Sequence, residues 1–508
     1  MKKLFILLTV LLVVGVSCKD FLTVDEKNPN SASSVPAYLI LPAALNLTAY
    51  DVNYNDFWRF IYFWYGLMSC SGGYSQPADL TQYKLINGAF QDNWNWAYIN
   101  LQNYDYIIKN ATGAVNNPYR AIAKIMKAYI YQYLVDSYGN IPYTEALQTD
   151  AGILKPKFDN QKTIYEDLVV QLDSAMKLID TAPSNVAEVG DYDIVYHGDM
   201  SLWWKFANTL KLRMLINQSD MTGRSAYITA ALATTPHTTA DYIGVAEGAW
   251  NNPGYSQSAG KMNPFWENFY KQDGSNQADG LGYYVAGQDA CDFLNTTNDP
   301  RKLRFFQAYT GTTIQGNYFG ALVLNLPSVT SKLGPGMLQA FNQSAPLMTD
   351  VESLFLQAEA VARGFVTGND SNLYKAAVTQ SIIYEGKKAS SDPPTYVPLT
   401  AANAATYLKQ PIANVHYDAS SPVAIKVKQI ITQKWIAANG LPVYSVWTDY
   451  RRTGYPNFLH FSQDAARQSD TPPVRLLYPQ SEINVNNDNV LLQGTINVFT
   501  SKIFWQNR

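Results

Sequence analysis

Residue types that commonly carry catalysis are sparse and scattered in this sequence. The four histidines, His197, His237, His416 and His460, are too far apart to form a local zinc-binding pattern such as H-E-x-x-H. There is no G-x-S-x-G nucleophile turn, no G-x-x-x-x-G-K-[ST] phosphate loop and no G-x-G-x-x-G turn. We therefore predict that the protein uses no cofactor and no metal ion.

Dispersed carboxylates leave one enzymatic alternative open. The acid and base of a glycoside hydrolase can be far apart in the sequence and meet only in the fold. Glu247, Glu267, Asp273 and Asp279 lie among aromatic residues and could form such a pair. Most of the 41 acidic residues in a chain like this act as helix caps, surface charges or ion-pair partners. We therefore expect a non-catalytic protein and keep the glycoside hydrolase as the lesser alternative.

Aromatic residues offer a better mechanism than carboxylates do. The chain has 36 Tyr, 21 Phe and 11 Trp among 508 residues, and its formal net charge is only −3. This near-neutral charge lacks the positive surface that phosphate backbones require, so we predict no nucleic-acid partner. Tyr and Trp rings stack on the C–H faces of sugars, and their polar atoms bond hydroxyl groups without needing net charge. An uncharged amphipathic ligand is the best fit.

Two loop segments combine these rings with amide side chains. One covers residues 69–83 and the other covers residues 250–284. We predict that the ligand-binding residues are Tyr74, Gln76, Tyr83, Trp250, Tyr255, Trp266, Tyr270 and Tyr283.

Other rings near these loops have the spacing of buried helix faces. Trp58, Tyr62 and Tyr65 are spaced i, i+4 and i+7, which favours packing over ligand binding. Trp94 and Trp96 begin a predicted helix, and we expect both to belong to the core.

Helical periodicity predicts the elements that position these loops. Apolar residues recur at helical spacing after Arg120 and again after Ile164, and Asp199 has the character of an N-cap. Thr349 and Glu352 have capping-box spacing. Further helices are predicted over 373–384 and 424–438. Few segments alternate with the period of a strand, so the fold class is predominantly α.

The domain organisation follows from the same pattern. Tyr129, Tyr165 and Trp203 head successive helices 36 and 38 residues apart, close to the 34-residue period of tetratricopeptide repeats. Such helix pairs form a scaffold for loops. We predict one α-helical domain over residues 37–508, with long loops at 66–93 and 221–349.

The N-terminus has the features of an export signal. Lys2 and Lys3 precede an apolar run that is too short to span a membrane, which predicts a signal peptide over residues 1–17. Cys18 follows Ser17, as in a bacterial lipobox, although Gly15 replaces the usual leucine. We predict lipid attachment at Cys18 and a tether over residues 18–36. A conventional signal peptide with an incidental cysteine is the alternative.

The two remaining cysteines leave two possibilities. Cys70 and Cys291 could form a disulfide in an oxidising compartment, or they could be small buried apolar residues, which we favour.

Short motifs occur in order over nearly the whole chain: K-A-Y-I-Y at 127–131, L-V-D-S-Y-G-N-I-P-Y at 134–143, D-I-V-Y at 193–196, W-K-F-A-N-T-L at 204–210, D-P-R at 299–301, A-E-A at 358–360, Q-K-W-I-A at 433–437, W-T-D-Y-R-R-T-G at 447–454 and R-L-L-Y-P at 475–479. With these motifs the chain resembles the SusD/RagB family of nutrient-binding outer-membrane lipoproteins of Bacteroidetes, particularly its SusD-like branch.

The resemblance implies an α-helical fold with tetratricopeptide-like helix pairs beside a loop-rich ligand-binding region. It implies a surface-exposed lipoprotein that captures an oligosaccharide, or another nutrient such as a peptide, without catalysis. The expected partner is a SusC-like TonB-dependent transporter of the outer membrane. The quoted motifs are expected to be scaffold residues, because ligand contacts in this family lie in variable loops. A helical-repeat adaptor that acts through protein contact is the main alternative.

Overall fold

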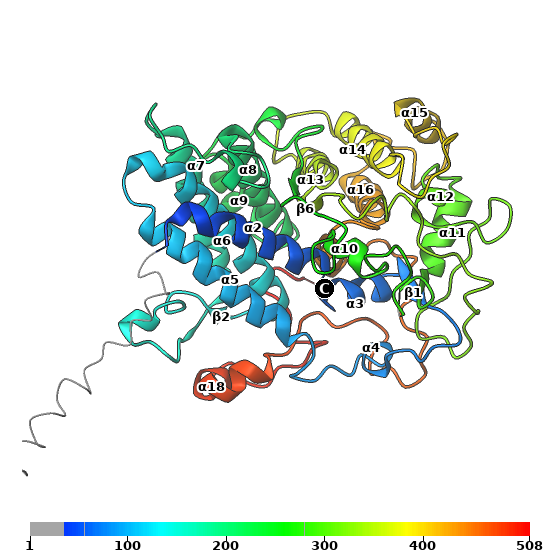
Figure 1. The fold of residues 1–508 in the computed structure, drawn as a ribbon, viewed down its shortest axis with the longest axis horizontal. Coiled ribbons are helices and arrows are strands. Elements are labelled where there is room, and N and C mark those ends of the chain that lie inside the picture. Colours follow the sequence, from blue (N-terminus) through cyan, green and yellow to red (C-terminus); the bar gives the residue numbers. More distant parts are fainter. Residues whose placement is uncertain (1–34, 55, 279, 508) are drawn as a thin grey trace, which may run out of the picture. The chain divides into compact units, whose positions relative to one another are not determined.

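Consecutive helices pack side by side in the computed structural model, which describes residues 35–54, 56–278 and 280–507 (Figure 1). The helices of the first half are α2 (Ala37–Tyr54), α3 (Asp56–Trp64), α4 (Ala78–Thr81), α5 (Gln91–Asn110), α6 (Asn117–Tyr138), α7 (Gln161–Asp180), α8 (Met200–Asn217) and α9 (Ser225–Leu232). Those that follow are α10 (Pro264–Glu267), α11 (Gln288–Thr296), α12 (Lys302–Phe305), α13 (Asp350–Ala362), α14 (Asp370–Glu385), α15 (Ala401–Leu408), α16 (Val423–Ala437), α17 (Tyr444–Thr453) and α18 (Gln480–Leu491). The predicted α fold class is confirmed.

Helix α6 lies at the centre of the first group of helices and contacts α2, α5, α7 and α8. It is buried on nearly every side, as expected for a helix whose apolar residues surround its axis. Pro118 lies in its first turn, and Gly139 ends it with a φ of 77°, a conformation that glycine adopts without strain. The successive packing of α6, α7 and α8 matches the predicted helix-pair scaffold.

Side-chain caps fix where several predicted helices begin. Asn160 accepts hydrogen bonds from two backbone amides of α7, and Asp199 does the same for α8. Thr349 accepts the backbone amide of Glu352 at the start of α13. The predicted starts at Asp199 and Thr349 are confirmed.

A second group of helices has its own apolar cluster. Its buried side chains come from α13, α14, α15 and α16 and include Phe355, Tyr374, Ile382, Tyr407 and Ile430. The opposite side of α13 contributes Leu356 and Ala360 to the larger cluster built around α2, α3 and α5–α8. Helix α13 therefore separates two apolar cores.

Short strands join loops that are distant in the sequence. The described strands form antiparallel pairs: β1 (Met68–Cys70) with β5 (Tyr284–Ala286), β2 (Ile141–Pro142) with β3 (Phe158–Asp159), and β4 (Ala249–Asn251) with β6 (Ala345–Met348). The region 221–349 contains long loops and also helices such as α9 and α11.

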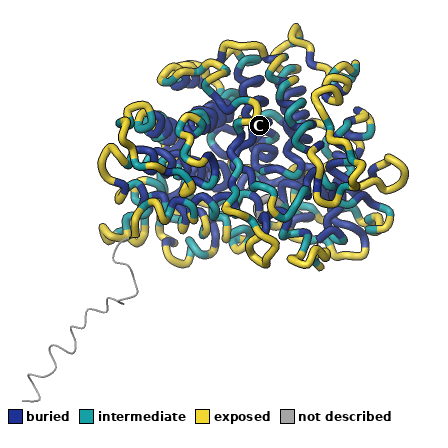
Figure 2. Tube along the Cα trace, turned by 45° about the horizontal axis from the view of Figure 1, so that its top comes forward, coloured by how far each residue is buried: buried dark blue, intermediate teal, exposed yellow. Residues whose placement is uncertain are grey.

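Buried residues follow the helices and the strand pairs, whereas exposed residues gather at the loops (Figure 2). Cys70 and Cys291 are both buried and unpaired, so the structure supports the apolar interpretation of these two residues. Trp94 is buried, but Trp96 is 39% exposed, so the prediction that both belong to the core is wrong for Trp96. Within the described residues, no helix is long and apolar enough to cross a membrane.

The motif at 134–143 joins the first helix group to the C-terminal region. The Asp136 carboxylate is fully buried and accepts hydrogen bonds from Tyr165 (2.8 Å) and Trp505 (2.7 Å). Burial raises the pKa of Asp136 to about 6, despite the nearby positive charge of Arg451. The Arg451 guanidinium donates to the backbone oxygens of Asp136 and Val474. These contacts give the motif at 134–143 a structural role.

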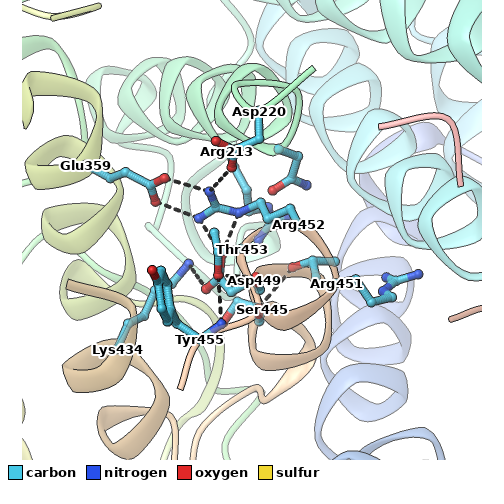
Figure 3. Close-up of polar contacts among 12 residues, drawn as sticks. Arg213, Asp220, Glu359, Lys434, Ser445, Asp449, Arg451, Arg452, Thr453 and Tyr455 are labelled. Atoms are coloured by element: carbon cyan, nitrogen blue, oxygen red, sulfur yellow. Dashed lines mark hydrogen bonds and ion pairs between the residues drawn. The ribbon is translucent and has the colours of Figure 1, made fainter. Parts of the chain in front are cut away.

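An ion-pair network lies between the two apolar cores (Figure 3). The guanidinium of Arg452, on α17, donates to both carboxylate oxygens of Glu359 on α13 at 2.6 Å and to Asp449 at 2.7 Å. Arg363 joins Glu359 to Asp220 at 2.8 Å, and Lys434 on α16 pairs with Asp449 at 2.9 Å. The charges of these side chains balance within the network.

Glu359 gives this network a pH-dependent contribution to stability. Its side chain is buried, which by itself would raise its pKa, but Arg452 and Arg363 outweigh this effect and lower the pKa from 4.5 to about 2. A carboxyl group whose pKa is lower in the folded state stabilises the fold above its unfolded-state pKa. A shift of this size corresponds to about 3 kcal/mol, which is lost as the pH falls from 4.5 through 2.

We expect Glu359→Gln to lower the free energy of unfolding at pH 7 by about 3–5 kcal/mol, because it leaves buried guanidinium groups without their counter-charge. The acid-induced loss of stability between pH 4.5 and 2 should also become shallower than in the wild type. Urea denaturation over a series of pH values measures both effects. Asp488→Asn, at a side chain that is 82% exposed, is the matched control and should change stability by less than about 0.5 kcal/mol. Equal urea midpoints for Glu359→Gln and wild type at pH 7 would contradict this role.

Candidate functional site

The pairing of β1 with β5 brings the two predicted aromatic loops together. Cys70 lies opposite Tyr284 in this pair, so the chain after β1 runs beside the chain before β5. The backbone amide of Ser71 donates to the Tyr283 oxygen at 2.9 Å, and the Ser71 hydroxyl donates to the Gly282 oxygen at 2.5 Å. The loops at 71–77 and 280–283 therefore form one continuous surface.

A third loop, residues 316–327, completes this surface. The Gly72 amide donates to the Asn325 oxygen at 2.7 Å, and the Asn317 side chain donates to the Cys70 oxygen at 3.0 Å. The Gln76 amide group donates to the Ala321 oxygen and accepts from the Gly320 amide, both at 2.9 Å. Gln76 thus holds two loops together, which differs from the direct ligand contact predicted for it. We call the surface of these three loops the three-loop surface.

Tyr74 and Tyr283 lie together on the three-loop surface. Their ring centres are 5.7 Å apart in an edge-to-face arrangement, and Tyr74 is 40% exposed. Tyr283 is half-buried, and its hydroxyl oxygen accepts from the Cys70 thiol. A Cβ atom placed on Gly282 would lie 2.8 Å from the Tyr74 hydroxyl oxygen, so the absence of a side chain at position 282 lets the Tyr74 ring lie against the backbone.

The third loop has exposed aliphatic side chains. Leu322, Val323 and Leu326 are 100%, 85% and 54% exposed. Leu326 is also next to Gly73, because a Cβ atom placed there would be 3.8 Å from Leu326 Cδ2. The site residues were predicted from aromatic and amide side chains, so these aliphatic residues were not among them. The signal was present as an apolar run between Gly320 and Pro327 with no helical or strand partner.

Tyr83 does not reach the three-loop surface. Its side chain is completely buried, its ring packs edge-on against Trp64, and its hydroxyl oxygen accepts from the Ser462 amide at 2.9 Å. This burial is at odds with the prediction that Tyr83 contacts ligand, so we no longer count it among the candidates. The positive φ of 56° at Tyr83, in the turn that follows α4, directs its ring inward.

Trp266 and Tyr270 form a separate stacked pair. Their ring centres are 4.4 Å apart with an angle of 25° between the planes. Asn263 caps the short helix α10 by accepting the Trp266 amide, which fixes the position of the pair. Trp266 is only 9% exposed, whereas Tyr270 is half-buried, so Tyr270 presents the accessible part of this pair.

Trp250 and Tyr255 lie near the β4–β6 strand pair. Trp250 is half-buried and stacks on Tyr384 of α14 with 4.9 Å between ring centres. The Tyr255 hydroxyl accepts from the Asn251 side chain at 3.3 Å. The predicted residues therefore divide into three neighbourhoods, and Tyr74, Gln76 and Tyr283 are the ones that the three-loop surface unites.

The loop carboxylates are occupied by structural partners. Glu247 pairs with Lys205 at 2.7 Å and accepts the Gly244 amide, and Glu267 accepts the Gly260 amide at 2.6 Å. Asp273 accepts from the backbone and the hydroxyl of Ser275 in its own turn. Asp279 and Cys18 lie outside the described residues, as does the side chain of Trp58.

The exposed ring of His460 lies beside the half-buried ring of Tyr318 in the third loop. His460 is exposed and lies 4.7 Å from the ring centre of Tyr318. Its Nδ1 is 2.7 Å from a carboxylate oxygen of Asp289, whose pKa burial raises to about 6. The Tyr318 hydroxyl donates to Asp292 at 3.1 Å. Sequence reasoning missed this pair because the partners are far apart in the chain.

The three-loop surface is suited to an uncharged ligand. Tyr74, Tyr283, Leu322, Val323 and Leu326 offer ring and aliphatic faces with no charged group among them. Among the described residues, no cluster of His, Cys, Asp and Glu could hold a metal ion. The surface can therefore bind by stacking, apolar contact and neutral hydrogen bonds.

Solved structures share this fold. The chain superposes on a chitin-binding protein with a TM-score of 0.73 and 22% identity, over 93% of this chain and all of that one. A SusD homologue from Bacteroides fragilis gives 0.73 and 20%, with 93% of this chain and all of that one covered. A SusD/RagB family protein from Bacteroides thetaiotaomicron gives 0.73 and 20%, with 94% and 100% covered.

No curated protein matches the chain. Residues 29–479 match the SusD-like family described as "Starch-binding associating with outer membrane". This match covers most of the sequence, and the shared fold agrees with it. The chain belongs to the SusD-like family of starch-binding proteins that associate with the outer membrane.

Proposed function

We propose that this protein is a lipid-anchored nutrient-binding protein of the outer membrane that captures a neutral oligosaccharide on the three-loop surface. The observation that carries the proposal is the convergence of three distant loops on an exposed, uncharged patch around Tyr74. Family membership and the resemblance to a chitin-binding protein support a carbohydrate ligand.

We further propose that the protein passes its ligand to a SusC-like TonB-dependent transporter and does not alter it chemically. The engagement of Glu247, Glu267 and Asp273 by structural partners supports a non-catalytic role. Leu322 and Val323 are exposed aliphatic side chains, which favours protein contact as a second function of the same surface. Covering such side chains with a partner protein lowers the free energy of the system.

Tyr74→Ala should weaken binding of soluble starch or chitin oligosaccharides about 2- to 10-fold, the loss expected for one ring contact worth about 0.5–1.5 kcal/mol. Isothermal titration calorimetry measures the affinity. Gly282→Ala should weaken it as well, because the added Cβ atom displaces the Tyr74 ring.

Each of these variants has a matched control. Tyr192→Ala removes a ring with the same exposed fraction of 40% outside the three loops. Gly88→Ala adds a methyl group at an exposed glycine where the nearest atom is 4.0 Å away. Neither control should change affinity. Unchanged glycan affinity in both Tyr74→Ala and Gly282→Ala, with wild-type binding intact, would rule out the three-loop surface as the site.

The double variant Leu322→Ser with Val323→Ser tests the contact with the transporter. It should reduce co-purification with the membrane transporter, because the apolar surface that the partner covers is lost, while Tyr74→Ala should leave co-purification unchanged. Leu491→Ser with Leu492→Ser is the matched control, since these leucines are 68% and 80% exposed at the end of α18. Equal co-purification by the test and control pairs would argue against this contact.

Cys18→Ala should move the protein from the membrane fraction to the soluble fraction, because lipid attachment requires the Cys18 thiol. Fractionation followed by immunoblotting measures the shift, and Cys70→Ala, which removes a buried thiol, should stay with the membrane. Retention of Cys18→Ala in the membrane fraction at the wild-type level would refute the lipid anchor.

A further inference from the structure

A pocket of about 240 Å³ lies between helices α5, α6 and α7, in a part of the chain separate from the loops described above. Its walls include Lys124 and Lys127 of α6, Leu168 and Gln171 of α7, and Tyr143 after β2. The Lys127 side chain is 26% exposed and Gln171 is half-buried, so the pocket opens to the surface. Its volume is slightly below the ~300–1,000 Å³ typical of pockets for drug-sized ligands, which favours a small ligand.

Lys124 and Lys127 line the pocket, and Asp105, Asp159 and Asp167 are the carboxylates bonded to its lining residues. Asp105 is shared between Lys127 (2.6 Å) and Lys109 (2.7 Å). Within the described chain, neither Lys124 nor Arg120, one turn earlier on α6, forms an ion pair with a carboxylate. Arg120 donates only to the Asn117 side-chain oxygen, at 3.4 Å.

The ammonium group of Lys124 is bonded to neutral acceptors and not to a carboxylate. It donates to the Gln171 side-chain oxygen at 2.9 Å and to the Ser174 hydroxyl at 3.1 Å. Burial lowers the pKa of Lys124, and the positive charges of Arg120 and Lys127 lower it further. The negative charge of Asp167 acts in the other direction and raises the pKa of Lys124. The Asp167 carboxylate accepts from the side-chain nitrogen of Gln171 at 3.3 Å. An ammonium group with three hydrogens and two neutral partners retains capacity for one more acceptor.

A tyrosine ring and aliphatic side chains form another part of the pocket wall. Tyr143 packs edge-on against Tyr131 with 4.7 Å between ring centres, and its hydroxyl donates to Asp167. Leu168 and Ala128 add aliphatic surface. A pocket wall that contains two lysines and a tyrosine ring matches a molecule that has an anionic group on a compact C–H-bearing ring.

We propose that this pocket binds a sugar acid, with the carboxylate of the sugar accepting from Lys124 and the sugar ring packing against Tyr143. The site is independent of the three-loop surface: it takes a charged monosaccharide unit, whereas the three-loop surface takes a neutral chain. Binding at one site can therefore fail while binding at the other is retained.

Isothermal titration calorimetry of the full chain with D-glucuronate tests the proposal. Saturable binding by the wild type should weaken about tenfold or more in Lys124→Met, because a charge-assisted contact is lost. Lys177→Met, at an exposed lysine of the same helix α7 as Gln171, is the matched control and should bind like the wild type. Glucose, which lacks the carboxylate, should not bind at this site.

A second variant covers the case in which Lys124→Met does not fold. Gln171→Glu places a carboxylate beside Lys124 and should weaken glucuronate binding as well. Unchanged glucuronate affinity in a folded Lys124→Met or Gln171→Glu variant overturns the proposal, as does the absence of saturable binding by the wild type up to about 50 mM. Acetate or inorganic phosphate binding as tightly as glucuronate overturns the assignment to a sugar acid.

Discussion

The buried ion pair between Arg452 and Glu359 holds the two halves of the helical scaffold in register. Helix α13 gives one side to each apolar core, and Glu359 lies on this helix between them. Apolar contacts alone are tolerant of sliding, because their energy depends on area and not on direction. A bidentate guanidinium–carboxylate contact fixes both distance and angle. Two further ion pairs extend this network. Arg363 pairs with Asp220, which follows α8, and Lys434 of α16 pairs with Asp449.

The three loops combine buried and exposed residues: Leu281 and Phe319 belong to the larger apolar cluster, whereas Tyr74 and Leu322 are exposed. The three-loop surface is held by backbone hydrogen bonds, by the amide of Gln76 and by the β1–β5 pair. Tyr74 and the aliphatic side chains at 322–326 extend from this frame and make few of its contacts. Substitutions at these exposed positions should therefore cost the fold little stability.

The sequence was informative where interactions are local. Helical periodicity and the caps at Asp199 and Thr349 depend on neighbours within a few residues, and both caps were confirmed. Tyr83 shows the limit: its ring chemistry suggested ligand contact, but the turn after α4 directs it into the core. The exposed position of Trp96 and the partnership of His460 with Tyr318 depend on tertiary packing that no local pattern records. The Lys124 pocket could not be predicted from the sequence either, because its lining residues come from three different helices.

The hydrogen bonds of Gln76 to the third loop bear on the order in which the chain folds. Gln76 and Ala321 are separated by 245 residues, and Asn317 and Cys70 by 247. Contacts across such separations close large loops and form slowly compared with neighbouring helices. The scaffold helices α5 to α8 can pair while the chain is still emerging, but the three-loop surface must wait for residues beyond 321. A partly folded chain would therefore have a stable helical core before the three-loop surface forms.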